Sequence, residues 1–295
     1  MLRSPFSADA GRGPARAGGA RRWGARRRFA VGALIVVLCA VAGAALLTYV
    51  AFVRPPEHHP AAFLARGRQP GTTTLVVAAG ASTTHASLSA DYVALLRGQF
   101  GGRGYEFVNA GANGDTSAGL LGRLDAIVAC QPEAVTILIG TNEARDDPGD
   151  GAALVAFRAN LGAILARLAA ETDARVAVLS LPPLGEDFAG DSNRTVARYN
   201  AAIREVAATH GATYLPLHEA LRALVERDAA WRRTPYTFRP TGLASVAIRR
   251  YVGRESWDTI AARNGFVALT DGIHLSDRGG AVAARLIGAW LAPTE

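Results

Sequence analysis

One serine lies in surroundings that suit a nucleophile, within the stretch LVVAAGASTTHA at residues 75–86. An apolar run ends in glycine and alanine, and Ser82 follows among small side chains. Such residues are also common in ordinary turns. A serine hydroxyl attacks a carbonyl only when a neighbouring base takes its proton, usually an imidazole that a carboxylate orients. The stretch DGIH near the C-terminus supplies Asp271 and His274 within one loop, although this spacing is also typical of a helix cap beside a surface histidine.

Two further loops carry groups that could stabilise the oxyanion formed in such a reaction. The stretch NAGANGDTSAG, residues 109–119, contains Gly114, and GTNE, residues 140–143, contains Asn142. A backbone N–H and a side-chain amide are the usual donors to a developing oxyanion. Glycine-rich loops also bind phosphate, but residues 109–119 lack the G-x-G-x-x-G spacing of a dinucleotide site.

Three of these loops follow apolar segments that have the pattern of buried strands, and the loop of Asp271 and His274 comes just before the last predicted helix. The predicted strands alternate with segments of helical spacing. Alternation of this kind predicts a three-layer α/β/α sandwich with a parallel five-stranded sheet, whose active groups gather at the carboxyl ends of the strands. The predicted strands are 73–79, 105–109, 134–139, 175–181 and 212–216. The predicted helices are 88–99, 118–129, 151–170, 193–210, 217–229 and 277–291.

The four loops, in this order, resemble the sequence blocks of the SGNH hydrolases, also called the GDSL esterase/lipase family. The resemblance covers about residues 72–292 and implies a flavodoxin-like fold. It implies that Ser82 is the nucleophile, that His274 and Asp271 complete the triad, and that Ser82, Gly114 and Asn142 form the oxyanion hole. The reaction needs no metal or organic cofactor.

One block departs from the family pattern, because Ala81 stands where the family usually has aspartate before the serine. That aspartate is not the acid of the triad, so the substitution bears on the rigidity of the loop and on the rate. His85 and Glu143 also lie in or near the blocks, and we interpret both as loop residues.

The basic charge is concentrated at the N-terminus, and the rest of the chain is balanced. The chain has a formal net charge of +7 and no lysine. Residues 1–28 hold eight arginines and one aspartate, which leaves 24 arginines and 24 carboxylates elsewhere. A basic surface for nucleic acid is therefore not expected on the globular part.

An uncharged apolar stretch follows the basic tail, at residues 29–53. As a helix it would be about 37 Å long, enough to cross a hydrocarbon core of roughly 30 Å. Arginines before a span favour a cytoplasmic N-terminus. We therefore expect residues 1–28 to be a cytoplasmic tail, 29–53 an uncleaved signal anchor, and the catalytic domain to lie outside the cytoplasm. A cleaved signal peptide, or a twin-arginine signal, would instead make the protein secreted.

Two other features, a proline-rich segment and the two cysteines, bear on metal binding and disulfide formation. The proline-rich residues 54–71 are expected to be an extended linker, and the metal-capable side chains of Glu57, His58 and His59 fall within it. We expect no metal site there. The two cysteines, Cys39 and Cys130, do not suggest a stabilising disulfide within the domain.

The long insertion at residues 230–268 is rich in arginine and aromatic residues, with seven arginines against two carboxylates. It is either a subdomain that packs on the core or a lid whose cations, including Arg249 and Arg250, face an anionic substrate or a lipid surface. Part of it is expected to be helical, with Ser256 as the N-cap and Asn264-Gly265 as the stop.

The sequence thus predicts a membrane-attached serine ester hydrolase that acts on a lipid, acyl or acetylated glycan ester. Two alternatives remain open. One is a binding module with little or no turnover, and the other is an O-acyltransferase that uses the same residues.

Overall fold

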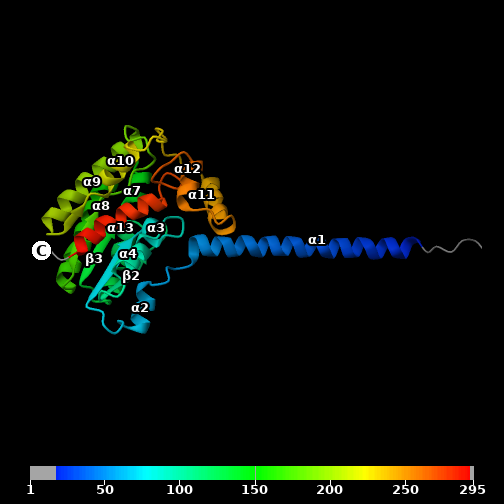
Figure 1. Cartoon of the computed structure of the whole chain (residues 1–295), viewed down its shortest axis with the longest axis horizontal. Helices are drawn as coiled ribbons and strands as arrows, with labels where there is room; N and C mark the ends of the chain where they lie inside the picture. Colours follow the sequence, from blue (N-terminus) through cyan, green and yellow to red (C-terminus); the bar gives the residue numbers. More distant parts are fainter. Residues whose placement is uncertain (1–17, 150, 293–295) are drawn as a thin grey trace, which may run out of the picture. The chain divides into compact units, whose positions relative to one another are not determined.

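The computed structural model describes residues 18–149 and 151–292 (Figure 1). The chain divides into two units, with the boundary between Leu46 and Leu47. The first unit is the helix α1, Gly18–Thr48, apart from its last two residues. Everything that positions the predicted site belongs to the second unit.

The N-terminal helix is apolar and exposed between Phe29 and Leu46. Its large apolar side chains in this range are exposed to solvent. Within residues Arg27–Val53, which include the π-helical turn η1, Tyr49–Val53, the apolar window has a mean hydropathy of 2.7 and no buried residue, whereas Ala51 in η1 is buried. By length and composition this segment is a candidate for a membrane anchor or a signal sequence. Helix α8, Ala152–Glu171, is also long and apolar enough to span a membrane, but five of its apolar side chains are buried in the core.

The second unit is built on five parallel strands in the order β2-β1-β3-β4-β5. This is the flavodoxin-like order, and it confirms the predicted fold class. Gly80 at the end of β1 is aligned with Gly111 of β2 and Leu138 of β3, so these three strands end at one edge of the sheet. The strands are β1 Thr74–Gly80, β2 Tyr105–Gly111, β3 Ala134–Leu138, β4 Arg175–Leu179 and β5 Thr213–Leu215.

Both faces of the sheet are covered by helices, because each strand is apolar on both sides. Leu75 and Val77 of β1 pack with α8 and α9 on one face, and Val76 and Ala78 pack with α4, α10 and α13 on the other. Figure 1 shows α4 and α13 lying side by side across the sheet. The helices of the two layers are α4 Tyr92–Phe100, α5 Ser117–Gly122, α6 Leu124–Val128, α8, α9 Asp191–Thr209, α10 Leu217–Glu226 and α13 Asp277–Leu291.

The prediction of one continuous helix at residues 118–129 was wrong. The structure has two short helices, α5 and α6, which meet at Arg123. The backbone of Arg123 is not helical, with φ −117° and ψ 14°, and its side chain turns toward the sheet. Two very short helices at strand ends, α3 Ser82–His85 and α7 Thr141–Asp146, were not predicted.

The segment expected to be an extended linker is partly helical. Helix α2, Pro60–Arg66, begins with proline at its first position, where the fixed φ angle of proline suits a helix and its missing N–H is not needed. Phe63 is buried in the core, and Arg66 pairs with Glu106 on β2. Residues 60–66 are therefore part of the folded unit.

The insertion at residues 230–268 is ordered and forms α11 Pro240–Ala247, the π-helical turn η2 Ile248–Val252 and α12 Trp257–Arg263. Ser256 caps α12, as predicted, by accepting a hydrogen bond from Thr259 N at 3.1 Å. Val246, Trp257 and Ile260 form a small apolar cluster with Leu88 and Ala90, which follow α3. The insertion is therefore fixed by packing against the rest of the folded unit.

Candidate active site

Ser82 lies at the start of α3, directly after β1. The chain turns sharply at Gly80, where a Cβ atom would collide with the side chain of Thr84 and the carbonyl of Leu138. Ala81 is buried in the apolar core and its carbonyl accepts hydrogen bonds from Thr84 N and His85 N. The side chain at position 81 thus packs against apolar neighbours, and the turn is held by backbone bonds.

The structure brings Ser82, His274 and Asp271 together. Ser82 Oγ is 2.9 Å from His274 Nε2, and His274 Nδ1 is 2.7 Å from Asp271 Oδ2. The other oxygen of Asp271 accepts hydrogen bonds from the backbone N–H groups of Ile273 and His274. Since an ionised carboxylate only accepts, the proton of the neutral ring lies on Nδ1, and Nε2 is left to accept the serine O–H.

The environment keeps Asp271 ionised. Its side chain and that of His274 are each only 7% exposed. Burial opposes ionisation, but the neighbouring His274 ring and the backbone donors outweigh it and hold the pKa of Asp271 below its usual value. A carboxylate that remains charged inside the protein can fix the tautomer of the imidazole and stabilise its protonated form.

The loops that carry Gly114 and Asn142 flank Ser82, because β1 lies between β2 and β3 in the sheet. The two loops meet, since Asn142 Nδ2 donates to Asp115 O at 2.7 Å. An amide nitrogen carries two protons, so one remains for another acceptor. Within residues 18–149 and 151–292, neither the Ser82 N–H nor the Gly114 N–H donates a hydrogen bond. Gly114 has φ +73°, a backbone conformation that glycine adopts more readily than other residues.

Arg123 ties the strand ends and the loop together, and sequence reasoning missed it. Its guanidinium donates to Gly80 O at 3.0 Å, to Ala110 O at 2.9 Å and to Asp115 Oδ2 at 2.7 Å. Gly80 precedes the serine turn, and Asp115 follows Gly114 and accepts from Asn142. Arg123 lies within the helix predicted at residues 118–129, and nothing in that pattern indicated a contact with the strand ends.

Arg145 and Glu186 were also missed. Arg145 Nη1 donates to Asn142 Oδ1 at 3.0 Å, which orients the amide so that its nitrogen faces the loop of Asp115. Glu186 is fully buried and accepts hydrogen bonds from Val267 N and Ala268 N, just before the loop of Asp271. Burial raises the pKa of Glu186, although these backbone donors act in the opposite direction.

The interpretation of His85 and Glu143 as loop residues was wrong, since His85 ends α3 and Glu143 lies in α7. Glu143 accepts a hydrogen bond from Ser117 N at the start of α5, so it supports a helix end. His85 is half-buried beside Arg54, and burial lowers its pKa. Among the residues that the structure describes, no group of three or more His, Cys, Asp or Glu side chains could hold a metal ion. Cys130 is buried and Cys39 is exposed, and both are free.

The insertion borders the site. Gly272, between Asp271 and His274, has φ +92°, and a Cβ there would lie 3.1 Å from Phe266 and 3.2 Å from Tyr236. Arg250 donates to Glu255 O at 3.0 Å and stacks on Trp257 at 4.7 Å. Neither Arg249 nor Arg250 lines the cavity beside Asp271, where the insertion instead presents Arg239.

Comparison with solved structures supports the fold. An acetyl xylan esterase matches with a TM-score of 0.53 and 17% identity over 74% of this chain and 100% of its own. An acetylxylan esterase from Geobacillus stearothermophilus matches with a TM-score of 0.55 and 16% identity, over 77% of this chain and 98% of its own. An alpha/beta hydrolase from the metagenome of Lake Arreo, Spain, matches with a TM-score of 0.54 and 19% identity, over 74% of this chain and 94% of its own. No curated protein matches the sequence.

The fold and the comparisons define a carboxylic ester hydrolase. The model of the GDSL-like lipase/acylhydrolase family matches residues 76–282, which include all four loops described above. The chain belongs to this family.

Proposed function

We propose that Ser82, His274 and Asp271 form the catalytic triad of this esterase. The observation that carries the proposal is the continuous hydrogen-bonded path from Ser82 Oγ through the His274 ring to the buried Asp271 carboxylate. Ser82 Oγ attacks the carbonyl carbon of the ester while its proton passes to His274 Nε2. The tetrahedral intermediate collapses, and the alcohol leaves with the proton from His274.

Water then hydrolyses the acyl-enzyme by the same two kinds of step. His274 takes a proton from water, the hydroxide attacks the acyl carbon, and Ser82 Oγ recovers the proton as the acid leaves. The oxyanion of each intermediate accepts from the Ser82 N–H, the Gly114 N–H and the second proton of Asn142 Nδ2. The free state of both N–H groups supports these roles.

The acyl group is proposed to be small, and acetyl is the first candidate. Two of the solved structures with the same fold are acetylxylan esterases. We also propose that residues 29–53 remain as a membrane anchor, with residues 1–28 in the cytoplasm and the catalytic domain, residues 72–292, outside it. The apolar helix and the basic tail support this orientation.

The test of the triad is covalent labelling with a fluorophosphonate, together with hydrolysis of p-nitrophenyl acetate. Wild-type protein should be labelled at Ser82, and Ser82→Ala should lose both labelling and turnover while it remains folded. The matched control is Ser87→Ala, five residues further in the same region, which should keep both. Turnover by Ser82→Ala at the wild-type rate would refute the assignment.

A further inference from the structure

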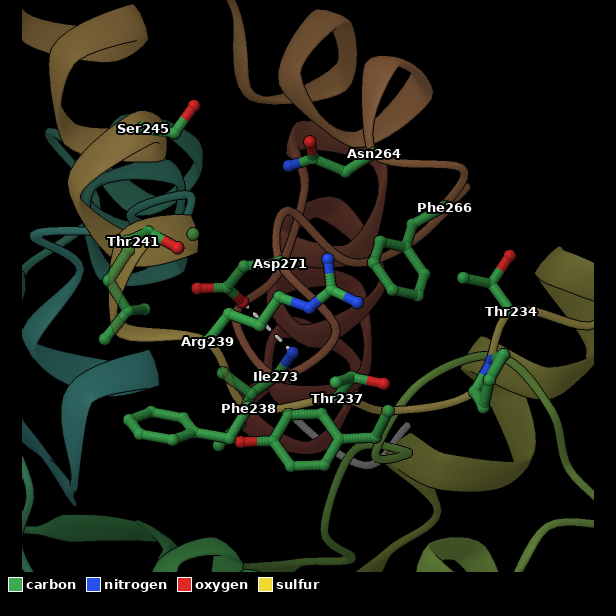
Figure 2. A pocket seen from close by; sticks show the side chains of 14 residues that line it. Thr234, Thr237, Phe238, Arg239, Thr241, Ser245, Asn264, Phe266, Asp271 and Ile273 are labelled. Atoms are coloured by element: carbon green, nitrogen blue, oxygen red, sulfur yellow. Dashed lines mark hydrogen bonds between the residues drawn. The ribbon is translucent and has the colours of Figure 1, made fainter.

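A cavity of about 470 Å³ opens between the insertion and the loop of Asp271 (Figure 2). Residues 234–245 supply most of its wall, and Asn264 and Phe266 supply another side. Asp271 and Ile273 also line it, so the cavity adjoins the proposed triad. The family motifs account for none of the lining residues except Asp271 and Ile273.

Two sets of contacts join the wall of this cavity to the proposed active site. Tyr236 and Phe266 lie against Gly272 in the loop of Asp271. The ring of Phe238 lies 5.6 Å from the guanidinium of Arg145, which holds the Asn142 amide. The insertion therefore contacts both the loop of the proposed acid and an arginine bound to a proposed oxyanion donor.

The wall of the cavity suits a polyhydroxylated group. Among the residues that the structure describes, the hydroxyls of Thr237, Thr241 and Ser245 take part in no hydrogen bond, so each is free to donate and to accept. Tyr236 and Phe238 add aromatic surface, which packs well against the C–H face of a sugar ring. The Tyr236 hydroxyl is buried and has no hydrogen-bond partner, and burial raises the pKa of Tyr236 to about 12, so Tyr236 contributes an uncharged aromatic side chain to the wall. A long acyl chain would require a mainly aliphatic wall.

The cavity also holds one uncompensated cation. Arg239 lines the cavity, and in the view of Figure 2 its guanidinium is drawn between Asp271 and Phe266. In the described part of the chain Arg239 forms no ion pair, and the oxygens of Asp271 are taken by His274 and by backbone N–H groups. Arg145, whose guanidinium lies against the ring of Phe238, is already bound to Asp146 and Asn142. A guanidinium can pair with a carboxylate through two parallel N–H···O bonds.

We propose that this cavity binds the alcohol part of the substrate, a sugar unit that carries a carboxylate, and that Arg239 determines the preference for that carboxylate. The proposal rests on the proposed function, since the cavity would hold the group that Ser82 releases from its acetyl ester. The acyl group stays at the serine, and the sugar leaves with the proton from His274.

The experiment compares three acetate esters with the full chain in detergent micelles. They are a monoacetylated glucuronic acid, a glucose acetylated at the same hydroxyl, and p-nitrophenyl acetate. The two sugars differ only in the carboxylate. Wild-type protein should show about tenfold higher kcat/KM for the glucuronate ester than for the glucose ester, the size of one charge-assisted hydrogen bond.

Three variants test separately the charge of Arg239, the hydroxyl of Thr241 and the insertion as a scaffold. Arg239→Gln should bring the ratio of the two sugar esters close to one by raising KM for the glucuronate ester. Thr241→Val should lower kcat/KM for both sugar esters alike. Arg233→Gln, an exposed arginine of the same insertion outside the cavity, is the matched control and should change neither. Hydrolysis of p-nitrophenyl acetate should be unaffected in Arg233→Gln, and in the other two variants it should change less than hydrolysis of the sugar esters.

The proposal is overturned if wild type does not prefer the glucuronate ester, or if Arg239→Gln keeps the preference. It is also overturned if Arg239→Gln impairs all three esters equally, because the arginine would then only support the fold. If p-nitrophenyl acetate is hydrolysed through Ser82 while neither sugar ester reacts, the cavity proposal fails and the triad stands. If Ser82→Ala still hydrolyses p-nitrophenyl acetate, the proposed function itself fails.

Discussion

Replacing Arg123 by methionine tests whether the oxyanion loop is held in place by one side chain. Methionine keeps the length of the chain but removes the three hydrogen bonds to Gly80 O, Ala110 O and Asp115 Oδ2. It leaves Asp115, whose side chain is 11% exposed, without its countercharge. Since Asp115 O accepts from Asn142 and Asp115 adjoins Gly114, the loss should reach both proposed donors.

The expected loss of stability follows from the burial of the pair. Removing one partner of a buried ion pair costs about 3–5 kcal/mol. Arg123 is 31% exposed, so part of the charge is screened and the lower end, about 3 kcal/mol, is expected. A shift of the donors by about 1 Å should lower kcat by about 100-fold, with little change in KM for a small ester.

The measurements are denaturant unfolding followed by tryptophan fluorescence, and kcat for p-nitrophenyl acetate where each variant is fully folded. Arg103→Met, an exposed arginine just before β2, is the matched control and should change neither quantity. The double variant Arg123→Met with Asp115→Asn should recover about 1–2 kcal/mol, because no carboxylate is left unpaired. A folded Arg123→Met variant with wild-type kcat would refute the reasoning, since the loop would then keep its geometry without the arginine.

Three further outcomes are expected. Asn142→Ala should lower kcat by about 10²–10³-fold with KM nearly constant, since the bond strengthens only in the transition state; steady-state kinetics showing a change in KM alone would contradict the oxyanion role. Burial raises the pKa of Glu186 above 4.5, so folding favours its protonated form. The stability that this carboxyl contributes is therefore complete below the unfolded-state pKa and is lost as the pH rises through the folded-state pKa. Melting temperatures against pH should show this loss in wild type and not in Glu186→Gln, and parallel curves would count against it. N-terminal sequencing of the mature protein should find residues 29–53 still attached, whereas a start between about residues 42 and 60 would indicate a secreted enzyme.

The fold class could be predicted from the sequence because it depends on a pattern repeated along the chain. Apolar strands that alternate with helical segments can bury both faces of a sheet only as a parallel α/β sandwich. The boundaries were less predictable where a tertiary contact overrides local preference. The break between α5 and α6 at Arg123 is one case, since the arginine turns toward the carbonyls of two strands.

The sequence by itself determined which chemistry the chain can support. Ser82, His274, Asp271, Gly114 and Asn142 were all predicted as site residues from four short loops, because each loop follows or precedes an element that the pattern defines. None of these loops by itself determines whether the serine, the imidazole and the carboxylate lie within hydrogen-bonding distance. Residues 82 and 274 are 192 positions apart, and only the order of the strands places them 2.9 Å from each other.

The tertiary structure alone decided what surrounds the triad. The insertion at residues 230–268 could be either scaffold or lid by its composition, since arginine and aromatic side chains serve both. Packing separates the two roles: Trp257 and Ile260 enter a core, while Phe238 and Arg239 face a cavity beside Asp271. Periodicity indicates which side of a helix is apolar, but residues 234–239, which form much of the cavity wall, lie before α11 and have no period. The side chains of these residues are directed by their contacts with distant loops, and those contacts exist only in the folded chain.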